Sequence, residues 1–257
     1  MTAFRSAPLV IAHRGLVGPR APENSLPAVR LALAAGCDGV EVDVRRTADG
    51  ALVLMHDPTP ARTAIAGDDD NGQADPRREV EETDLDSLQA LRLLTQDDGA
   101  EVRVPELADV LEEVLARNAV VVLDVKATGP GARVWRALAE ELLDRVPPEL
   151  RRLVVVQGRD QAALQEVAAR VPGVLTSLLT WAPVADAAGT WAVSRPDWSA
   201  RVLLTRDHLQ ARRVLAWTVN RPERMRRLVA DGADGIITDR PTVLLALLDR
   251  GPATVAS

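Results

Sequence analysis

The sequence has very few aromatic residues: it contains no tyrosine, one phenylalanine and five tryptophans among 257 residues. Proteins that bind nucleic acids usually present a basic surface with aromatic side chains on which bases stack. Here 37 acidic residues outnumber 31 basic ones, and the net charge is −6. The composition therefore disfavours a nucleic-acid partner.

Cysteine is scarcer still, because Cys37 is the only one. A single cysteine excludes a disulfide scaffold, and a chain of this length can bury a sufficient core without one. No apolar run approaches the roughly 18 residues that a membrane-spanning helix needs. Residues 1–8 contain no long apolar segment of the kind found in signal peptides. We therefore expect no membrane span and a cytoplasmic location.

Lysine is almost absent too, since Lys126 is the only lysine and all the other basic residues are arginines. Where arginine replaces lysine nearly everywhere, a remaining lysine suggests a position that needs a compact ammonium group rather than a planar guanidinium. Chance retention of a single surface lysine is the alternative.

What the chain has in abundance is short β-branched runs that alternate with segments of helical period. The runs that predict strands are 9–12, 39–44, 51–55, 119–125, 153–157, 174–179, 214–219 and 235–238. The segments that predict helices are 25–35, 106–117, 132–145, 160–170, 222–230 and 241–248. Eight strands with mostly helical connections in about 250 residues predict an α/β TIM (β/α)₈ barrel. A doubly wound open sheet is disfavoured, because no G-x-G-x-x-G follows the first strand.

Two stretches interrupt this alternation. Residues 58–103 are polar with little periodicity, and we expect them to form an inserted segment after strand three rather than a second domain. We thus expect residues 1–257 to form a single domain. Residues 180–200 contain Trp181, Trp191 and Trp198, and no element is predicted there.

The residues that could take part in catalysis or metal binding lie at the predicted carboxyl ends of the strands, where active sites of TIM barrels are built. His13 and Arg14 follow the first strand and His56 follows the third. Glu41 and Asp43 have the spacing that puts two side chains on one face of a strand, as do Asp124 and Lys126. Two other interpretations stay open for these pairs: Glu41 and Asp43 could be exposed on an edge strand, and Asp124 and Lys126 could form a structural ion pair.

If these faces point into the barrel, the carboxylates of Glu41, Asp43 and Asp124 converge near one mouth. Buried carboxylates need a compensating cation. An all-oxygen ligand set suits a hard divalent ion such as Mg²⁺ or Ca²⁺ better than zinc. The sequence therefore predicts a divalent metal site.

Taken in order, these residues resemble the glycerophosphodiester phosphodiesterase family. The resemblance runs from residue 9 to about 241. It is carried by H-R-G at 13–15, P-E-N at 22–24, E-x-D at 41–43, H-D at 56–57, V-P-E-L at 104–107, W-T-V-N at 217–220 and G-A-D-G-I-I-T-D-R-P at 232–241. Each motif alone is unspecific, but the ordered set is specific.

The resemblance implies a TIM barrel with an inserted segment, and it implies residue roles. His13 and His56 would be the general acid and base, Arg14 would hold the phosphate, and Glu41 and Asp43 would bind the metal. Lys126 matches the lysine of an E-x-K pair, in which Asp124 stands where the family usually has glutamate.

Two further positions bear on the substrate. Trp217 is expected to wall the glycerol side of the pocket, with a barrel-core role as the alternative. After the fifth strand the family often has Ser-Phe, whereas this chain has Gly158 and Arg159.

The expected reaction is metal-dependent hydrolysis of a small-molecule glycerophosphodiester to sn-glycerol 3-phosphate and an alcohol, with Arg14 and Lys126 binding the phosphate. One alternative is a lysophospholipase D or phospholipase-like enzyme that acts on a lipid. The other is a barrel that binds a phospho-ligand without catalysis. The sequence leaves open the preferred alcohol, the choice of Mg²⁺ or Ca²⁺, the assignment of acid and base, the nucleophile and the oligomeric state.

Overall fold

The structure is a computed structural model that describes residues 7–66, 74–97, 100–127, 133–183, 189–210 and 212–250. In this part of the chain eight parallel strands close into a barrel, because β1 pairs with β2 on one side and with β11 on the other. In order around the barrel, the strands are β1 (Leu9–His13), β2 (Gly39–Arg46), β6 (Val120–Val125), β7 (Val154–Gly158), β8 (Leu175–Leu179), β9 (Ala192–Pro196), β10 (Arg213–Trp217) and β11 (Gly235–Thr238). The predicted TIM barrel is confirmed.

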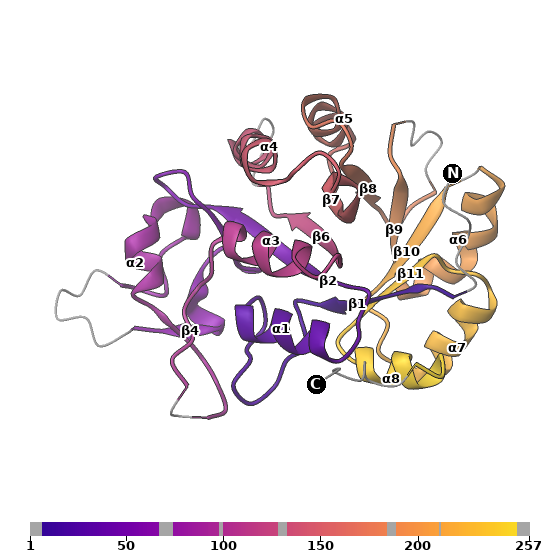
Figure 1. The fold of residues 1–257 in the computed structure, drawn as a ribbon, viewed down its shortest axis with the longest axis horizontal. Coiled ribbons are helices and arrows are strands. Elements are labelled where there is room, and N and C mark those ends of the chain that lie inside the picture. Colours follow the sequence, from indigo (N-terminus) through magenta and orange to yellow (C-terminus); the bar gives the residue numbers. More distant parts are fainter. Residues whose placement is uncertain are drawn as a thin grey trace.

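Helices cover the outside of the barrel (Figure 1). They are α1 (Leu26–Ala34), α3 (Leu107–Leu115), α4 (Arg133–Arg145), α5 (Gln161–Arg170), α6 (Asp197–Leu209), α7 (Pro222–Ala230) and α8 (Pro241–Leu247). One face of each strand packs against these helices in the largest apolar core, which includes Val10, Val121 and Val154. Alternate residues of the same strands form a separate apolar cluster, as the period of two requires. That second cluster, which includes Ile11, Val122, Leu215 and Ile237, fills the barrel interior.

The inserted segment follows β3 (Leu52–Leu54), the third strand in the chain, as predicted. Its elements are η1 (Pro60–Arg62), β4 (Ala64–Ile65), η2 (Val80–Glu82), α2 (Leu85–Gln89) and β5 (Arg92–Leu93). It has an apolar cluster of its own, which also includes Val53 and Met55. In Figure 1 the segment lies to one side of the barrel.

One of the eight predicted strands is not a barrel strand. β3 runs antiparallel to β2, with Leu54 opposite Val44, and forms a hairpin with it. The eighth barrel strand is instead β9, in the region where no element was predicted. Its sequence breaks the apolar pattern, because it contains Ser194 and Arg195, both buried.

The polar residues of β9 are buried because each has a partner. Arg195 is completely buried and donates to both carboxylate oxygens of Asp207 on α6, at 2.9 and 3.0 Å. Ser194 forms hydrogen bonds with Ser177 on the neighbouring strand β8 and with Gln157 on β7, one strand further round the barrel. Such pairs depend on distant residues, so the local sequence carries no signal for them. In the described part of the chain, no helix is long and apolar enough to cross a membrane.

Candidate active site

The site is built two residues beyond the apolar interior on several strands. Ile11 is followed two positions later by His13, Val122 by Asp124, Val155 by Gln157 and Leu215 by Trp217. Because the strand period is two, each later residue points to the same side as the apolar one, into the barrel mouth. The regular strand geometry therefore places these side chains without special local structure.

Strand register brings the predicted residues level with one another. His13 is opposite Glu41 across the β1–β2 pair, and Asp43 is opposite Asp124 across the β2–β6 pair. β2 lies between two parallel neighbours, and Glu41 and Asp43 are 3% and 1% exposed. The interpretation of these carboxylates as exposed edge-strand residues is therefore wrong.

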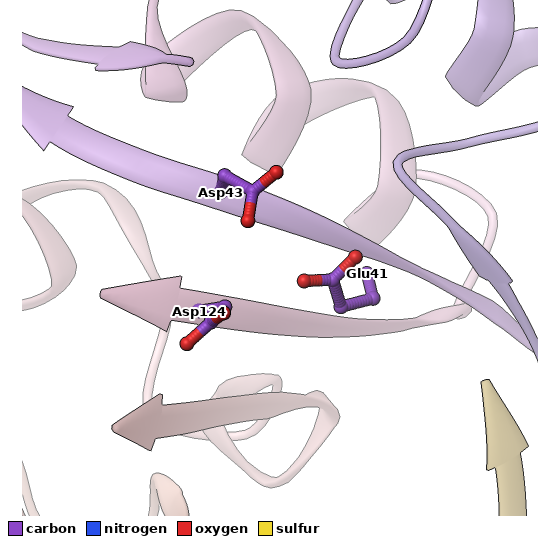
Figure 2. A group of neighbouring side chains, drawn as sticks. All are labelled: Glu41, Asp43 and Asp124. Atoms are coloured by element: carbon purple, nitrogen blue, oxygen red, sulfur yellow. The ribbon is translucent and has the colours of Figure 1, made fainter. Parts of the chain in front are cut away.

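The three carboxylates form one buried cluster (Figure 2). Glu41, Asp43 and Asp124 each offer an oxygen, and these three oxygens lie within 4.8 Å of one another. Lys126 lies against the cluster, with its Nζ 2.8 Å from Asp43 Oδ1 and 2.5 Å from Asp124 Oδ2. The only lysine of the chain thus forms the ion pair that the sequence analysis left open as an alternative, and it bridges two of the candidate ligands.

The electrostatics of the cluster favour a bound cation. Burial, with the charge of Asp43, raises the pKa of Glu41 to about 8. Burial alone would also raise the pKa of Asp43, but the charges of Lys126 and Arg14 outweigh it and hold that pKa below its ordinary value. A divalent ion would offset the remaining repulsion, and hard ions prefer oxygen ligands. The residues present could therefore hold a metal ion.

His13 is oriented by a carboxylate that directly follows the neighbouring strand, β11. Its Nδ1 donates to Asp239 Oδ1 at 2.6 Å, and its Nε2 lies 3.9 Å from Glu41 Oε2. Burial lowers the pKa of His13, but the hydrogen bond to Asp239 and the charge of Glu41 outweigh this, so the pKa is raised. Asn220 in turn donates from Nδ2 to Asp239 Oδ2 at 2.5 Å.

The sequence analysis missed Asp239 and Asn220 as site residues, although both belong to the motifs quoted above. A signal was available. Asp239 directly follows β11, and β11 is the neighbour of β1 in any closed barrel of this order. Its position at a strand end therefore places it beside His13.

His56 enters the site from the hairpin rather than from a barrel strand. Its backbone oxygen accepts hydrogen bonds from Arg45 Nε at 3.2 Å and Nη2 at 2.8 Å, which fix the chain just beyond β3. The His56 Nδ1 donates to Asp57 Oδ1 at 2.7 Å. Asp57 also accepts from Arg62 Nε at 2.5 Å.

Arg14 is held by a network that reaches the inserted segment. Its Nη1 donates to Glu23 Oε1 at 2.8 Å, and its Nε lies 3.0 Å from Asp43 Oδ2. Arg62 of the segment donates two further hydrogen bonds to Glu23, at 2.7 and 2.9 Å. Glu23 and Arg62 thus join the Arg14 side of the site to the His56 side, and no role for Arg62 was predicted.

The turn that carries Arg14 needs the glycine of the H-R-G motif. Arg14 and Gly15 have φ values of +55° and +81°. A Cβ added at Gly15 would lie 2.6 Å from the carbonyl carbon of Ala28. Only glycine allows α1 to pack this closely beneath the turn.

A cavity of about 160 Å³, here called the inner cavity, brings the predicted residues together. All eight residues predicted to act in the site line it: His13, Arg14, Glu41, Asp43, His56, Asp124, Lys126 and Trp217. The other lining residues are Gln157, Arg159, Leu179, Thr218 and Ile237. The inner cavity therefore offers two histidines, a carboxylate cluster and cationic groups to one small ligand.

Comparison with known proteins agrees with this arrangement. The glycerophosphoryl diester phosphodiesterase family matches residues 13–243. The chain belongs to this family. The match spans the barrel from the end of β1 into α8, and includes every residue of the predicted site.

Relatives cover almost the whole chain. A glycerophosphodiester phosphodiesterase from Caldanaerobacter subterraneus subsp. tengcongensis is 28% identical over 95% of this chain and 98% of its own length. A glycerophosphoryl diester phosphodiesterase structure from Silicibacter pomeroyi has a TM-score of 0.78 and 25% identity, and covers 95% of each chain. An Oleispira antarctica phosphodiesterase, solved with its product sn-glycerol-3-phosphate, shares the fold at a TM-score of 0.81 and 23% identity, over 95% of this chain and 97% of its own.

Proposed function

We propose that this member of the family hydrolyses glycerophosphodiesters to sn-glycerol 3-phosphate and an alcohol by acid/base catalysis between His13 and His56. The observation that carries the proposal is the inner cavity, which both histidines line together with the three-carboxylate cluster. Family membership supports the reaction class. The product is also the molecule bound to the Oleispira barrel.

The hydrogen bonds of the two imidazoles support their proposed roles. In each ring the Nδ1 is bonded to an aspartate, Asp239 for His13 and Asp57 for His56. A carboxylate on Nδ1 fixes the ring orientation and leaves Nε2 to exchange a proton with substrate. One imidazole removes a proton from the nucleophile and the other protonates the departing alkoxide.

The carboxylates of Glu41, Asp43 and Asp124 would hold a divalent cation, with Mg²⁺ or Ca²⁺ favoured by the all-oxygen donor set. When bound, such an ion stabilises negative charge on the phosphate oxygens. Arg14 and Lys126 line the same cavity and would bind the phosphate from the protein side. Trp217 lines the same cavity and would wall the glycerol end.

The structure favours a water-soluble diester over the lipid alternative. Beyond the inner cavity lies a second space of about 390 Å³, here called the outer groove, which shares His56, Asp124, Lys126, Arg159 and Leu179 with it. The rest of its lining combines three charged residues, Arg45, Asp57 and Asp160, with the apolar Pro58, Val125, Ala127 and Trp135. An acyl chain in this groove would desolvate its charged groups, which supports a polar alcohol as the occupant.

We also propose that the barrel and the inserted segment act as one domain over residues 1–257. The apolar cluster of the segment includes Val53 and Met55 of the β2–β3 hairpin. The Arg62 hydrogen bonds to Glu23 join the segment to the barrel at the site itself.

The proposal is tested by following the release of glycerol 3-phosphate from glycerophosphocholine by the purified protein and by a His13→Ala variant. We expect turnover by the parent protein and its near-complete loss in the variant. A variant that keeps full hydrolysis would overturn the proposed role of His13. Saturable binding of the diester with no turnover in the parent protein would favour the non-catalytic alternative.

A further inference from the structure

The end of β7 differs from the pattern typical of the family, and the structure supplies a physical reason. A Cβ added at Gly158 would lie 2.5 Å from the Trp135 ring, so the buried tryptophan of α4 occupies the space that a side chain at position 158 needs. Position 158 is therefore restricted to glycine, and the next residue, Arg159, is the first after β7 to present a side chain at the rim.

Arg159 lies where the inner cavity meets the outer groove, because it lines both. Its guanidinium carbon is 5.1 Å from the centroid of the Trp181 ring, which is a cation–π contact. Trp181 follows β8, the neighbour of β7, and is 50% exposed. The ring thus supports the guanidinium from one face and leaves its edge N–H groups open to a ligand.

The other cations that line the two spaces already have acidic partners. Arg14 contacts Glu23 and Asp43, and Lys126 contacts Asp43 and Asp124. Arg45 is buried, bonded to the His56 backbone oxygen, and lies 3.9 Å from Glu81. Among the residues that the structure describes, Arg159 has no carboxylate partner, so its charge remains available to a ligand.

The two carboxylates that line the outer groove but not the inner cavity, Asp57 and Asp160, already accept hydrogen bonds. Asp57 accepts from His56 and Arg62, and Asp160 caps α5 by accepting from the backbone N–H of Ala163 at 3.1 Å. Asp57 is thus paired with cationic groups, whereas Asp160 keeps its charge at the N-terminus of α5. Arg159 is the cation of the groove that has no carboxylate partner among the described residues.

We propose that Arg159 is a specificity-determining residue that favours diesters whose leaving alcohol carries an anionic group, a carboxylate or a second phosphate. This rests on the proposed hydrolysis, with the glycerol phosphate in the inner cavity and the alcohol in the outer groove. A guanidinium fixed against an aromatic ring can bind either anion through two parallel N–H groups.

The test compares kcat/KM for three diesters: glycerophosphoglycerol, with an uncharged alcohol; glycerophosphoserine, with a carboxylate; and glycerophosphoglycerophosphate, with a second phosphate. Loss of diester is followed by phosphorus NMR. The variants are Arg159→Gln, which removes the charge, and Arg159→Lys, which keeps it. Arg206→Gln is the matched control, because Arg206 is exposed on α6 and its substitution changes the net charge by the same amount. Melting temperatures establish that each variant is folded.

In Arg159→Gln we expect the ratio of kcat/KM for an anionic over the uncharged alcohol to fall about fivefold to tenfold, the order of a charge-assisted hydrogen bond at a solvent-exposed site. Arg159→Lys should restore part of the ratio, and Arg206→Gln should not change it. Raising the salt concentration should lower the ratio in the parent protein and in Arg206→Gln, but not in Arg159→Gln. The anionic substrate whose kcat/KM ratio falls more, glycerophosphoserine or glycerophosphoglycerophosphate, identifies the anion that Arg159 binds better.

Two results would overturn the proposal. If Arg159→Gln lowers kcat/KM for all three diesters by one factor, Arg159 acts on the phosphate that they share. If the ratio does not change, Arg159 does not select the alcohol at all. Both results leave the proposed hydrolysis standing, whereas absence of hydrolysis of every diester by the parent protein would overturn the hydrolysis together with this inference.

Discussion

The two histidines of the site reach the inner cavity in different ways. His13 ends a barrel strand, and the register of β1 with β2 sets it opposite Glu41. His56 follows the antiparallel β3 and depends on Arg45, Asp57 and Arg62 for its place. Regular backbone pairing positions one half of the site, whereas individual side-chain contacts position the other. The barrel half should therefore tolerate changes in its supporting residues better than the hairpin half.

The largest effect is expected from removing either imidazole. His13→Ala and His56→Ala should each lower kcat by about 10²- to 10⁴-fold, the usual contribution of a general acid or base. Steady-state hydrolysis of glycerophosphocholine measures this. A loss confined to one of the two variants would show that only that histidine takes part in proton transfer.

The next largest effect concerns the carboxylate on β6. Asp124→Asn removes one ligand charge, and we expect the apparent metal affinity to fall by at least about 100-fold, the upper end of what the loss of a supporting residue costs. Asp124→Glu restores the charge with the longer side chain that the family usually has there, and should keep metal-dependent activity. Titration of Mn²⁺ followed by its electron paramagnetic resonance signal measures the affinity. Equal affinity in Asp124→Asn and the parent protein would remove Asp124 from the ligand set.

Because the barrel half and the hairpin half of the site are held differently, substitutions of their supporting residues should lower kcat by different amounts. Arg62→Gln should lower kcat more than Asn220→Ala, because Arg62 bonds to both Glu23 and Asp57 whereas Asn220 reaches His13 only through Asp239. We expect about tenfold for the former and less for the latter. A larger fall in kcat for Asn220→Ala than for Arg62→Gln would contradict the view that the hairpin half depends more on its supporting side chains.

Asp239→Asn tests whether Asp239 sets the pKa of His13. Asp239 raises the pKa of that imidazole through its hydrogen bond and its charge, so the variant should have a lower His13 pKa. Proton NMR of the imidazole in the protein without metal measures the change directly. An unchanged or higher pKa in the variant would mean that Asp239 does not interact with His13 as described.

The smallest effect is on stability. The charges and hydrogen bonds of Arg62 and Arg14 outweigh the burial of Glu23 and lower its pKa in the folded state. Folding stability from this pair is therefore present above the unfolded pKa of about 4.5 and is lost as the pH falls through the folded value. We expect no more than about 1 kcal/mol at neutral pH, since the pair is partly exposed. Urea unfolding of the parent protein and Glu23→Gln should diverge near pH 7 and converge near pH 3.

The parts of the fold and site that depend on regular strand pairing could be predicted from the sequence, whereas those that depend on individual side-chain contacts could not. Strand periodicity put Glu41 and Asp43 on one face of their strand, and only the closed barrel shows that this face, like that of Asp124, points inward. It placed β3 in the barrel wrongly, because an apolar run of five residues has the same appearance in a parallel and an antiparallel strand. It missed β9, whose buried Arg195 is stabilised by Asp207 twelve positions away.

Of two side-chain contacts between distant segments, the sequence gives no signal for one, whereas the predicted barrel gives a signal for the other. The pairing of Arg62 with Glu23 joins residues 39 positions apart, and that of His13 with Asp239 joins residues 226 apart. The composition of either segment alone does not indicate such a partner. Only the closed barrel, which makes β1 and β11 neighbours, turns the second pair into an expectation.

The most direct test of the central claim, that one inner cavity combines a metal cluster with two histidines, is glycerophosphocholine hydrolysis after treatment with EDTA and again after adding Mg²⁺ or Ca²⁺. The account predicts that chelation abolishes glycerol 3-phosphate release and that one of the two ions restores it in the parent protein, but not in His13→Ala. Full activity of the parent protein after exhaustive removal of metal would contradict it.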